Sequence, residues 1–175
     1  INKNRFFYYK LNILMACQRT APINLTKSTT RECQSKCNFT YDYGLSDCSV
    51  VNKTTYLDIK CYNGSNVVSS DLLEGLLTVT GVRLYKPSLN KYENFKADAE
   101  LIITKTGRGR NLYLCIPIIG SGKTGSSAKW FNKFIPFSPE QKDRTTGINV
   151  NGYTLNSVIP QAPYIIYEGG SFDWN

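Results

Sequence analysis

The sequence contains no histidine, and this absence excludes the chemistry that depends most on an imidazole. Histidine is the commonest metal ligand in proteins, so zinc centres built on imidazoles are excluded. Cys115 is a conceivable nucleophile, but it would need a lysine or a helix terminus to activate it. Its place in an apolar strand favours inert burial.

Acidic residues and long apolar runs are also scarce. Lys and Arg number 21 against 13 Asp and Glu, which gives a net charge of +8 and favours an acidic partner, although the basic residues form no dense run. The apolar stretch at 1–16 is interrupted by Lys10 and is shorter than the roughly 20 residues that span a bilayer, so no transmembrane segment is predicted. We predict an N-terminal arm or edge strand at 1–15 and a single domain at 16–175.

The six cysteines are unevenly placed. Four of them crowd a loop-rich stretch that buries little apolar surface, so we predict disulfides there. A zinc knuckle is one alternative, but Cys33 and Cys37 are spaced one residue wider than Cys-x-x-Cys and no second close pair follows. Buried thiols are the other alternative. The candidate cysteines are Cys17, Cys33, Cys37, Cys48, Cys61 and Cys115.

Three β-strands are predicted between residues 81 and 117. Residues 82–85 alternate apolar and polar side chains, and Pro87 ends the strand. Residues 99–104 include three consecutive apolar residues, 101–103, which indicates burial on both faces. The turn at 107–110 then leads into a third strand at 112–119, which we expect to pair antiparallel with the second.

The remaining predictions are local. We expect strands at 39–43, at 50–62 before the Asn63-Gly64 turn, and at 76–85, in preference to a short helix capped by Ser70. Residues 139–152 read as polar turns, followed by apolar runs at 153–160 and 164–167.

The stretch 117–130 is predicted to be a surface loop. Residues 120–124 look like the end of a phosphate-binding loop, but Pro117 stands where that motif needs its first glycine. The Gly-Ser-Ser that follows Thr124 is a poor start for a helix. The aromatic residues at 130–138 favour core packing over an exposed patch.

The central stretch resembles the active-site sheet of the α-type carbonic anhydrases. In that family one strand carries two histidines at i and i+2, and the next reads acidic-Leu-His. Laid onto this pattern, the two histidine positions fall at Arg83 and Tyr85, and the acidic-Leu-His element falls on residues 100–102, ending at Ile102. Residues 21–25 and 51–53 are similar to the family's Ser-Pro-Ile-Asn-Ile and Asn-Thr-Gly segments. The sequence of residues 87–92, 96–103 and 114–118 is similar to the sequences of carbonic-anhydrase-like proteins of large double-stranded DNA viruses.

The resemblance implies a mostly β fold with a central, largely antiparallel twisted sheet, long loops and few short helices. It also implies degenerate metal-ligand positions, because Arg83 is a permanent cation, Ile102 has no lone pair and Tyr85 alone is not a site. We therefore expect no catalytic residue, no metal and no cofactor. The family continues past this point into a further strand and a threonine-proline turn, so the chain is either truncated at its C-terminus or completed by a partner.

The expected function is that of a non-catalytic structural protein located in the virion. It would be a minor capsid (cementing) subunit of a large DNA virus particle, in contact with the major capsid protein and neighbouring minor subunits. No specific nucleic acid is expected as a partner. Glu100 and Asp98 are expected to pair with Lys96 or Arg110 rather than to act as an acid–base pair.

The alternative function is a surface adhesion protein that binds acidic glycan through a basic patch. The residues of this predicted patch are Arg83, Lys86, Lys91, Lys105, Arg108 and Arg110.

Overall fold

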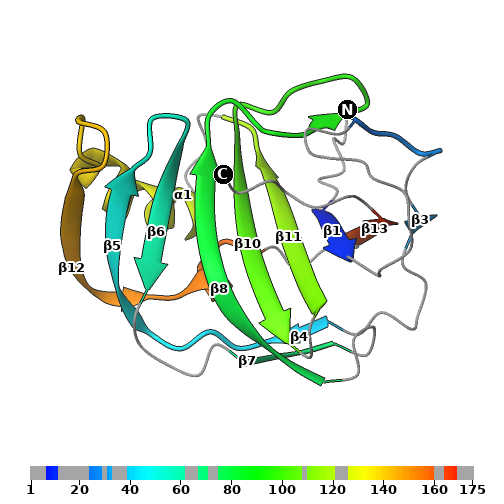
Figure 1. Cartoon of the computed structure of the whole chain (residues 1–175), viewed down its shortest axis with the longest axis horizontal. Helices are drawn as coiled ribbons and strands as arrows, with labels where there is room; N and C mark the ends of the chain where they lie inside the picture. The colour runs from blue at the N-terminus through cyan, green and yellow to red at the C-terminus, as the bar shows by residue number, and fades with distance from the viewer. Residues whose placement is uncertain are drawn as a thin grey trace.

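A large, mostly antiparallel β-sheet dominates the protein (Figure 1). The computed structural model describes residues 7–11, 24–28, 31–32, 39–61, 67–70, 75–107, 110–120, 126–159 and 164–168. Its main sheet has eleven strands, most of them in the order β12-β5-β6-β8-β10-β11-β1-β13-β3, while β7 pairs with both β8 and β4. The predicted fold class is confirmed.

The strands of the main sheet have the following bounds: β1 Phe7–Leu11, β3 Arg31–Glu32, β4 Phe39–Tyr41, β5 Ser46–Asn52, β6 Tyr56–Cys61, β7 Val67–Ser70, β8 Gly75–Tyr85, β10 Ala99–Gly107, β11 Arg110–Ile118, β12 Thr145–Tyr153 and β13 Tyr164–Glu168. A separate pair is formed by β2 (Asn24–Leu25) and β9 (Lys91–Tyr92), which run parallel. Three short helical segments complete the described part: α1 (Ser126–Phe134), η1 (Ile135–Phe137) and η2 (Leu155–Ser157).

The three strands predicted between residues 81 and 117 form the middle of the sheet. β10 pairs antiparallel with β8 on one side and with β11 on the other, and the β10–β11 hairpin closes at the pair Gly107–Arg110. Side chains of paired residues lie on the same face of an antiparallel sheet, and successive residues alternate between faces. Leu101 and Ile103 therefore point to one face and Ile102 to the other, and all three are buried.

The main hydrophobic core lies on the face of the sheet that carries Leu101 and Ile103, here called the back face. Helix α1 packs there, and its Trp130 is 3% exposed, with its ring 5.8 Å from that of Tyr153. The prediction of a loop up to residue 130 is thus wrong from Ser126 onward. Tertiary burial of the Trp130 side chain stabilises a helix whose local start signal is weak. Core packing of the aromatic residues is confirmed for Trp130.

Two other local predictions need correction. Residues 50–62 are not one strand, because β5 ends at Asn52 and β6 begins at Tyr56. Between them, the Asn52 side-chain oxygen accepts a hydrogen bond from the Thr54 N–H at 2.7 Å, and Thr54 has a φ of 71°. An asparagine side chain that bonds two residues onward is a strong turn former, and here it outweighs the strand propensity of its neighbours. Residues 145–152, predicted to be polar turns, belong to β12.

Strand β1 lies inside the sheet rather than at its edge. It pairs antiparallel with β11 and parallel with β13. The predicted strands at 39–43 and 76–85 correspond to β4 and β8. The Asn63-Gly64 turn and the motif at 121–124 lie outside the described residues. Over the part of the chain that is described, no helix is long and apolar enough to cross a membrane.

Candidate functional site

The three positions singled out by sequence lie together on the face of the sheet opposite α1, here called the front face. Arg83 and Ile102 are directly paired across β8 and β10, and Tyr85 is two residues further along β8, paired with Glu100. Since paired residues share a face, these four side chains point the same way. The sheet register therefore brings together the residues that the sequence comparison aligned with the metal ligands.

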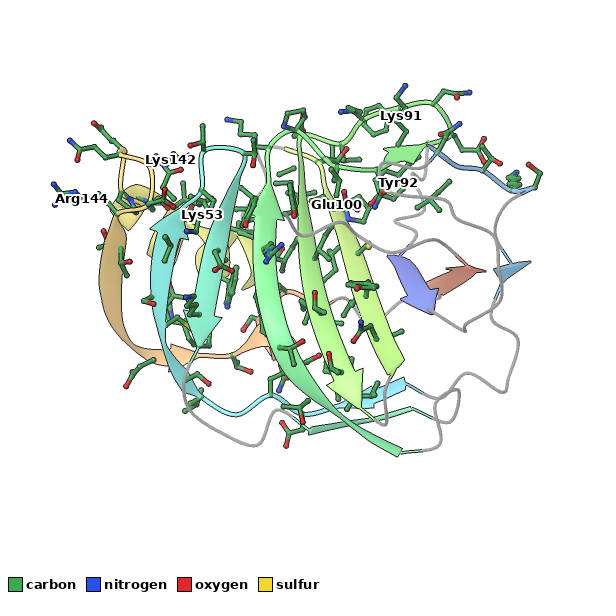
Figure 2. The ribbon with its side chains drawn as sticks, in the orientation of Figure 1. Lys53, Lys91, Tyr92, Glu100, Lys142 and Arg144 are labelled. Atoms are coloured by element: carbon green, nitrogen blue, oxygen red, sulfur yellow. A yellow bond between two sulfur atoms is a disulfide. The ribbon has the colours of Figure 1, made fainter. Side chains whose placement is uncertain are left out.

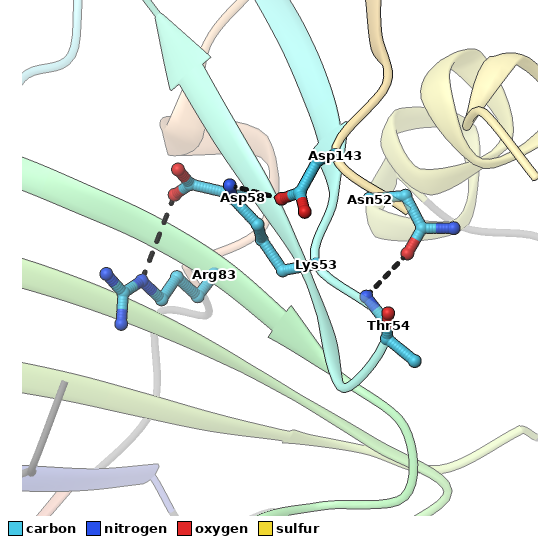
Figure 3. Close-up of polar contacts among 6 residues, drawn as sticks. All are labelled: Asn52, Lys53, Thr54, Asp58, Arg83 and Asp143. Carbon is cyan, nitrogen blue, oxygen red and sulfur yellow. Dashed lines mark hydrogen bonds and ion pairs between the residues drawn. The ribbon is translucent and has the colours of Figure 1, made fainter. Parts of the chain in front are cut away.

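Arg83 is held by two residues of the neighbouring strand β6. Its Nε atom lies 3.8 Å from a carboxylate oxygen of Asp58, its direct strand partner (Figure 3). Its guanidinium carbon lies 4.7 Å from the centre of the Tyr56 ring. Both members of the ion pair are largely buried. A fixed guanidinium at this point repels a metal cation, because it is positively charged and offers no lone pair for coordination.

Tyr85 lies beside the same ring. Its ring centre is 5.2 Å from that of Tyr56. Burial raises the pKa of the Tyr85 hydroxyl well above its ordinary value, although the positive charge of Arg83 opposes this shift. Tyr85 is therefore a neutral phenol at neutral pH, and a neutral phenol is a poor metal ligand.

Ile102 belongs to a second, smaller hydrophobic cluster on the front face. It packs with Cys115, its partner on β11, and with Tyr113, and the cluster is completed by Leu25 and by residues of the loop at 86–98. The front face is thus filled with apolar side chains at this point. Cys115 is fully buried, as the sequence indicated, and its sulfur lies 3.9 Å from Asn90 Nδ2.

Glu100 holds the loop at 86–98 against the front face of the sheet. Its carboxylate is fully buried and accepts hydrogen bonds from the backbone N–H and the side-chain amide of Asn90, both at 2.9 Å, and from the Tyr92 hydroxyl. Burial raises the pKa of the Glu100 carboxyl, and these donors oppose the shift. The buried carboxylate acts as the acceptor that fixes the loop over the sheet.

The predicted pairing of Glu100 and Asp98 with Lys96 or Arg110 is wrong. The partners of Glu100 are neutral donors of the loop, and Asp98 accepts a hydrogen bond from the Gly120 N–H at 2.6 Å. The spacing of charges along one strand does not show that a loop folds back across it. No other signal in the sequence points to Asn90 and Tyr92 as these donors.

A metal site of the anhydrase type does not fit these residues. Zinc needs imidazole, thiolate or carboxylate ligands converging on one point, with one position open for water. The side chains at the aligned positions are a guanidinium, a phenol and an alkyl group. Over the residues that the structure describes, no group of three or more cysteine, aspartate or glutamate side chains is placed to hold a metal ion.

Solved structures resemble this architecture. The α-carbonic anhydrase of Photobacterium profundum matches with a TM-score of 0.66 at 11% identity, over 89% of this chain and 76% of that one. Carbonic anhydrase Cah3 from Chlamydomonas reinhardtii, solved with acetazolamide, gives 0.65 at 15% identity, over 89% and 75%. Dioscorin, solved with ascorbate, gives 0.64 at 12% identity, over 89% and 72%.

The chain has an α-carbonic-anhydrase-like fold. No protein-family model matches the sequence, and no curated protein matches it either. At these identities the likeness concerns the fold alone. Within that fold, Arg83, Tyr85 and Ile102 lie on one face of the central sheet.

The residues of the predicted basic patch do not lie together on one surface of this carbonic-anhydrase-like fold. Lys105 is fully buried on the back face, where its Nζ atom lies 5.1 Å from the centre of the Tyr43 ring. Arg83 is held in its pair on the front face, whereas Lys86 and Lys91 are exposed. The side chains of Arg108 and Arg110 lie outside the described residues. The patch therefore loses Lys105, because the alternation of β10 turns that side chain into the core.

The disulfide prediction is confirmed for one pair and is wrong for Cys115, which is buried and forms no disulfide in the described part of the chain. Cys48 and Cys61 are directly opposite each other on β5 and β6 and are bonded. They border a small pocket at the back face, between Tyr43 and Trp130. Cys17, Cys33 and Cys37 lie outside the described residues, so the alternatives for them stay open.

Asp58 and Tyr56, which hold Arg83, were missed by the sequence reasoning. An acidic and an aromatic residue two positions apart on a strand predict a shared face. The residues across from them depend on the pairing of β6 with β8, which the sequence does not specify.

Proposed function

We propose that the chain is a non-catalytic structural protein built on a carbonic-anhydrase-like fold that has lost its zinc ligands. The observation that supports this proposal is the set of side chains that fill the front face. Arg83 is paired there with Asp58 over the Tyr56 ring, and Ile102 is packed against Cys115. A face filled in this way offers a stable shape and a surface, and no open coordination position.

The proposed role is that of a minor capsid (cementing) subunit of a large double-stranded DNA virus, located in the virion. Two features support this role. The sequence of residues 87–92, 96–103 and 114–118 is similar to that of carbonic-anhydrase-like proteins of such viruses. The net charge of +8 suits acidic neighbours. Its partners would be the major capsid protein and neighbouring minor subunits. Adhesion would come from many polar contacts made by rigid loops.

A histidine-restoration experiment tests the loss of the metal site. The triple variant R83H/Y85H/I102H places three imidazoles on one face of adjacent strands. We expect it to bind one equivalent of zinc or cobalt, with the absorption bands of tetrahedral cobalt, whereas the unmodified chain binds none and does not hydrate carbon dioxide. A control with I103H in place of I102H puts one imidazole on the back face and should not bind. Zinc and hydratase activity in the unmodified chain would disprove the proposal.

Particle composition tests the structural role. We expect the chain to co-purify with intact particles at a fixed ratio to the major capsid protein, through density-gradient centrifugation and a high-salt wash. Recovery from infected-cell cytosol alone would disprove this role.

A second candidate function is adhesion to acidic glycan. It is favoured by exposed lysines around the 86–98 loop, namely Lys86, Lys91 and Lys96. Elution from heparin at high salt, reduced by the K86E/K91E/K96E variant, is the result expected for this function. Elution at low salt would exclude glycan adhesion as the function.

A further inference from the structure

The tip of the loop at 86–98 presents an aromatic side chain to solvent. Phe95 is 50% exposed and follows a tight turn closed by reciprocal backbone hydrogen bonds between Tyr92 and Phe95, at 2.7 and 3.0 Å. The two central residues, Glu93 and Asn94, have φ angles of 52° and 65°, as a hairpin turn of type I′ requires. Isolated exposed apolar side chains are ordinary, so exposure alone says little.

What distinguishes this tip is how firmly its backbone is held. The Glu93 N–H donates to the Leu25 carbonyl at 2.8 Å, and the Asn94 N–H donates to the Asn24 side-chain oxygen at 2.9 Å. The Asn24 amide returns a bond to the Asn94 side chain at 2.6 Å, and the Lys27 N–H donates to the Glu93 carboxylate at 3.0 Å. Both central residues of the turn are therefore fixed to the segment at 24–27.

The base of the same loop is fixed to the sheet. Tyr92, which begins the turn, donates to the buried Glu100, and Asn90 donates to it twice. Figure 2 shows Tyr92 beside Glu100, with Lys91 at the outer edge of the molecule. A side chain presented on such a backbone loses little loop entropy when it is bound, which favours a preorganised contact.

The charge around the tip selects the kind of partner. Lys27, Lys91 and Lys96 are exposed in its neighbourhood, against two exposed carboxylates, Glu93 in the turn and Asp98 at the end of the loop. With a net charge of +8, a second copy of the chain would be repelled by this surface. A membrane is a poor occupant, because one aromatic ring with a few lysines supplies little apolar area for stable anchoring.

We infer that the turn at 92–95 docks onto a neighbouring protein whose surface carries an apolar pocket rimmed by aspartate and glutamate. Phe95 enters the pocket, and the flanking lysines contact the rim. Aromatic anchors in a desolvated pocket with a charged rim are the usual centre of a protein interface. This inference names the partner surface of the proposed assembly role and rests on that role for the statement that the partner is a particle subunit.

The test places the photo-crosslinking residue benzoylphenylalanine at position 95 of the full chain, and in a control at position 45. Leu45 is also exposed but precedes β5, at the opposite end of the central strands. Irradiation is carried out in infected cells and in purified particles, and the crosslinked peptides are sequenced. We expect crosslinks from position 95 to one protein, at a site containing aspartate or glutamate beside apolar residues, and no crosslink to that site from position 45.

Two variants complete the test. F95S is expected to keep the thermal stability of the parent and to weaken binding to depleted particles about 30-fold, the loss typical of an interface hot spot. K91E/K96E should weaken binding and reduce or reverse the loss of binding caused by added salt, because the attraction to the acidic rim is removed. L45S should bind like the parent.

The outcomes separate the two proposals. If the chain is absent from particles but position 95 crosslinks to an acidic protein in cells, the capsid role fails and the docking surface stands. If F95S assembles as the parent does, the docking surface fails and the capsid role stands. Binding to vesicles of phosphatidylserine and phosphatidylcholine that F95S abolishes, or crosslinks spread over many proteins, would overturn the inference.

Discussion

Replacing Lys105 with methionine is expected to stabilise the protein and to flatten its stability profile between about pH 6.5 and 9. Lys105 is fully buried on β10. Burial lowers the pKa of its ammonium group to about 6. Its Nζ atom lies 5.1 Å from the centre of the Tyr43 ring, a contact that favours the charged form, but desolvation is the larger effect.

The magnitude follows from proton linkage. In the unfolded chain Lys105 keeps its proton up to its ordinary pKa of 10.5, whereas in the folded protein it releases it at about 6. Between these values the unfolded state binds one more proton, so stability rises with pH by about 1.4 kcal/mol per unit. Below both values the cost of the buried ammonium is fully present. At pH 7 the upper limit of this cost is about 5 kcal/mol, and methionine removes it while keeping most of the side-chain volume.

The assay is urea unfolding of the oxidised protein at three pH values within this window. Because the chain contains no histidine, no imidazole titrates within this window. The parent and a K60M control, which changes an exposed lysine on β6, should both become more stable with pH, while K105M should be more stable than either and nearly independent of pH. A flat profile for the parent, or a K105M variant less stable than the parent at pH 7, would refute the reasoning.

Three further predictions concern other fixed points of the fold. Replacing Glu100 with glutamine should lower the free energy of unfolding in urea by about 3 kcal/mol, because the new amide donor then faces a donor of Asn90. An unchanged midpoint of urea unfolding would contradict the hydrogen bonds between Glu100 and Asn90. Replacing Cys48 and Cys61 together with alanine should cost about 3 kcal/mol, measured as a lower melting temperature, because their bond closes a short loop with a separation of 13 residues. A peptide map of the parent that lacks the Cys48–Cys61 disulfide would show this prediction to be wrong. Replacing Trp130 with alanine should cost about 3–5 kcal/mol through the cavity it leaves, and a loss below about 1 kcal/mol would argue against its burial.

Part of this fold was predictable from local signals. The alternation at 82–85, the apolar run at 99–104 and the glycine-rich turn at 107–110 predicted the three central strands and the antiparallel hairpin, because strand period and turn chemistry are properties of neighbouring residues. The sequence also determined that no imidazole can serve as a ligand.

Other features were decided only by the tertiary structure. With apolar residues at both 101 and 102, the sequence could not tell which face holds the main core, so the burial of Lys105 was not predictable. The partners of Arg83 and Glu100 come from a neighbouring strand and a loop that folds back. Period-2 alternation determines which residues of one strand share a face. Which strands pair, in what register and under which loop depends on the packing of the whole chain.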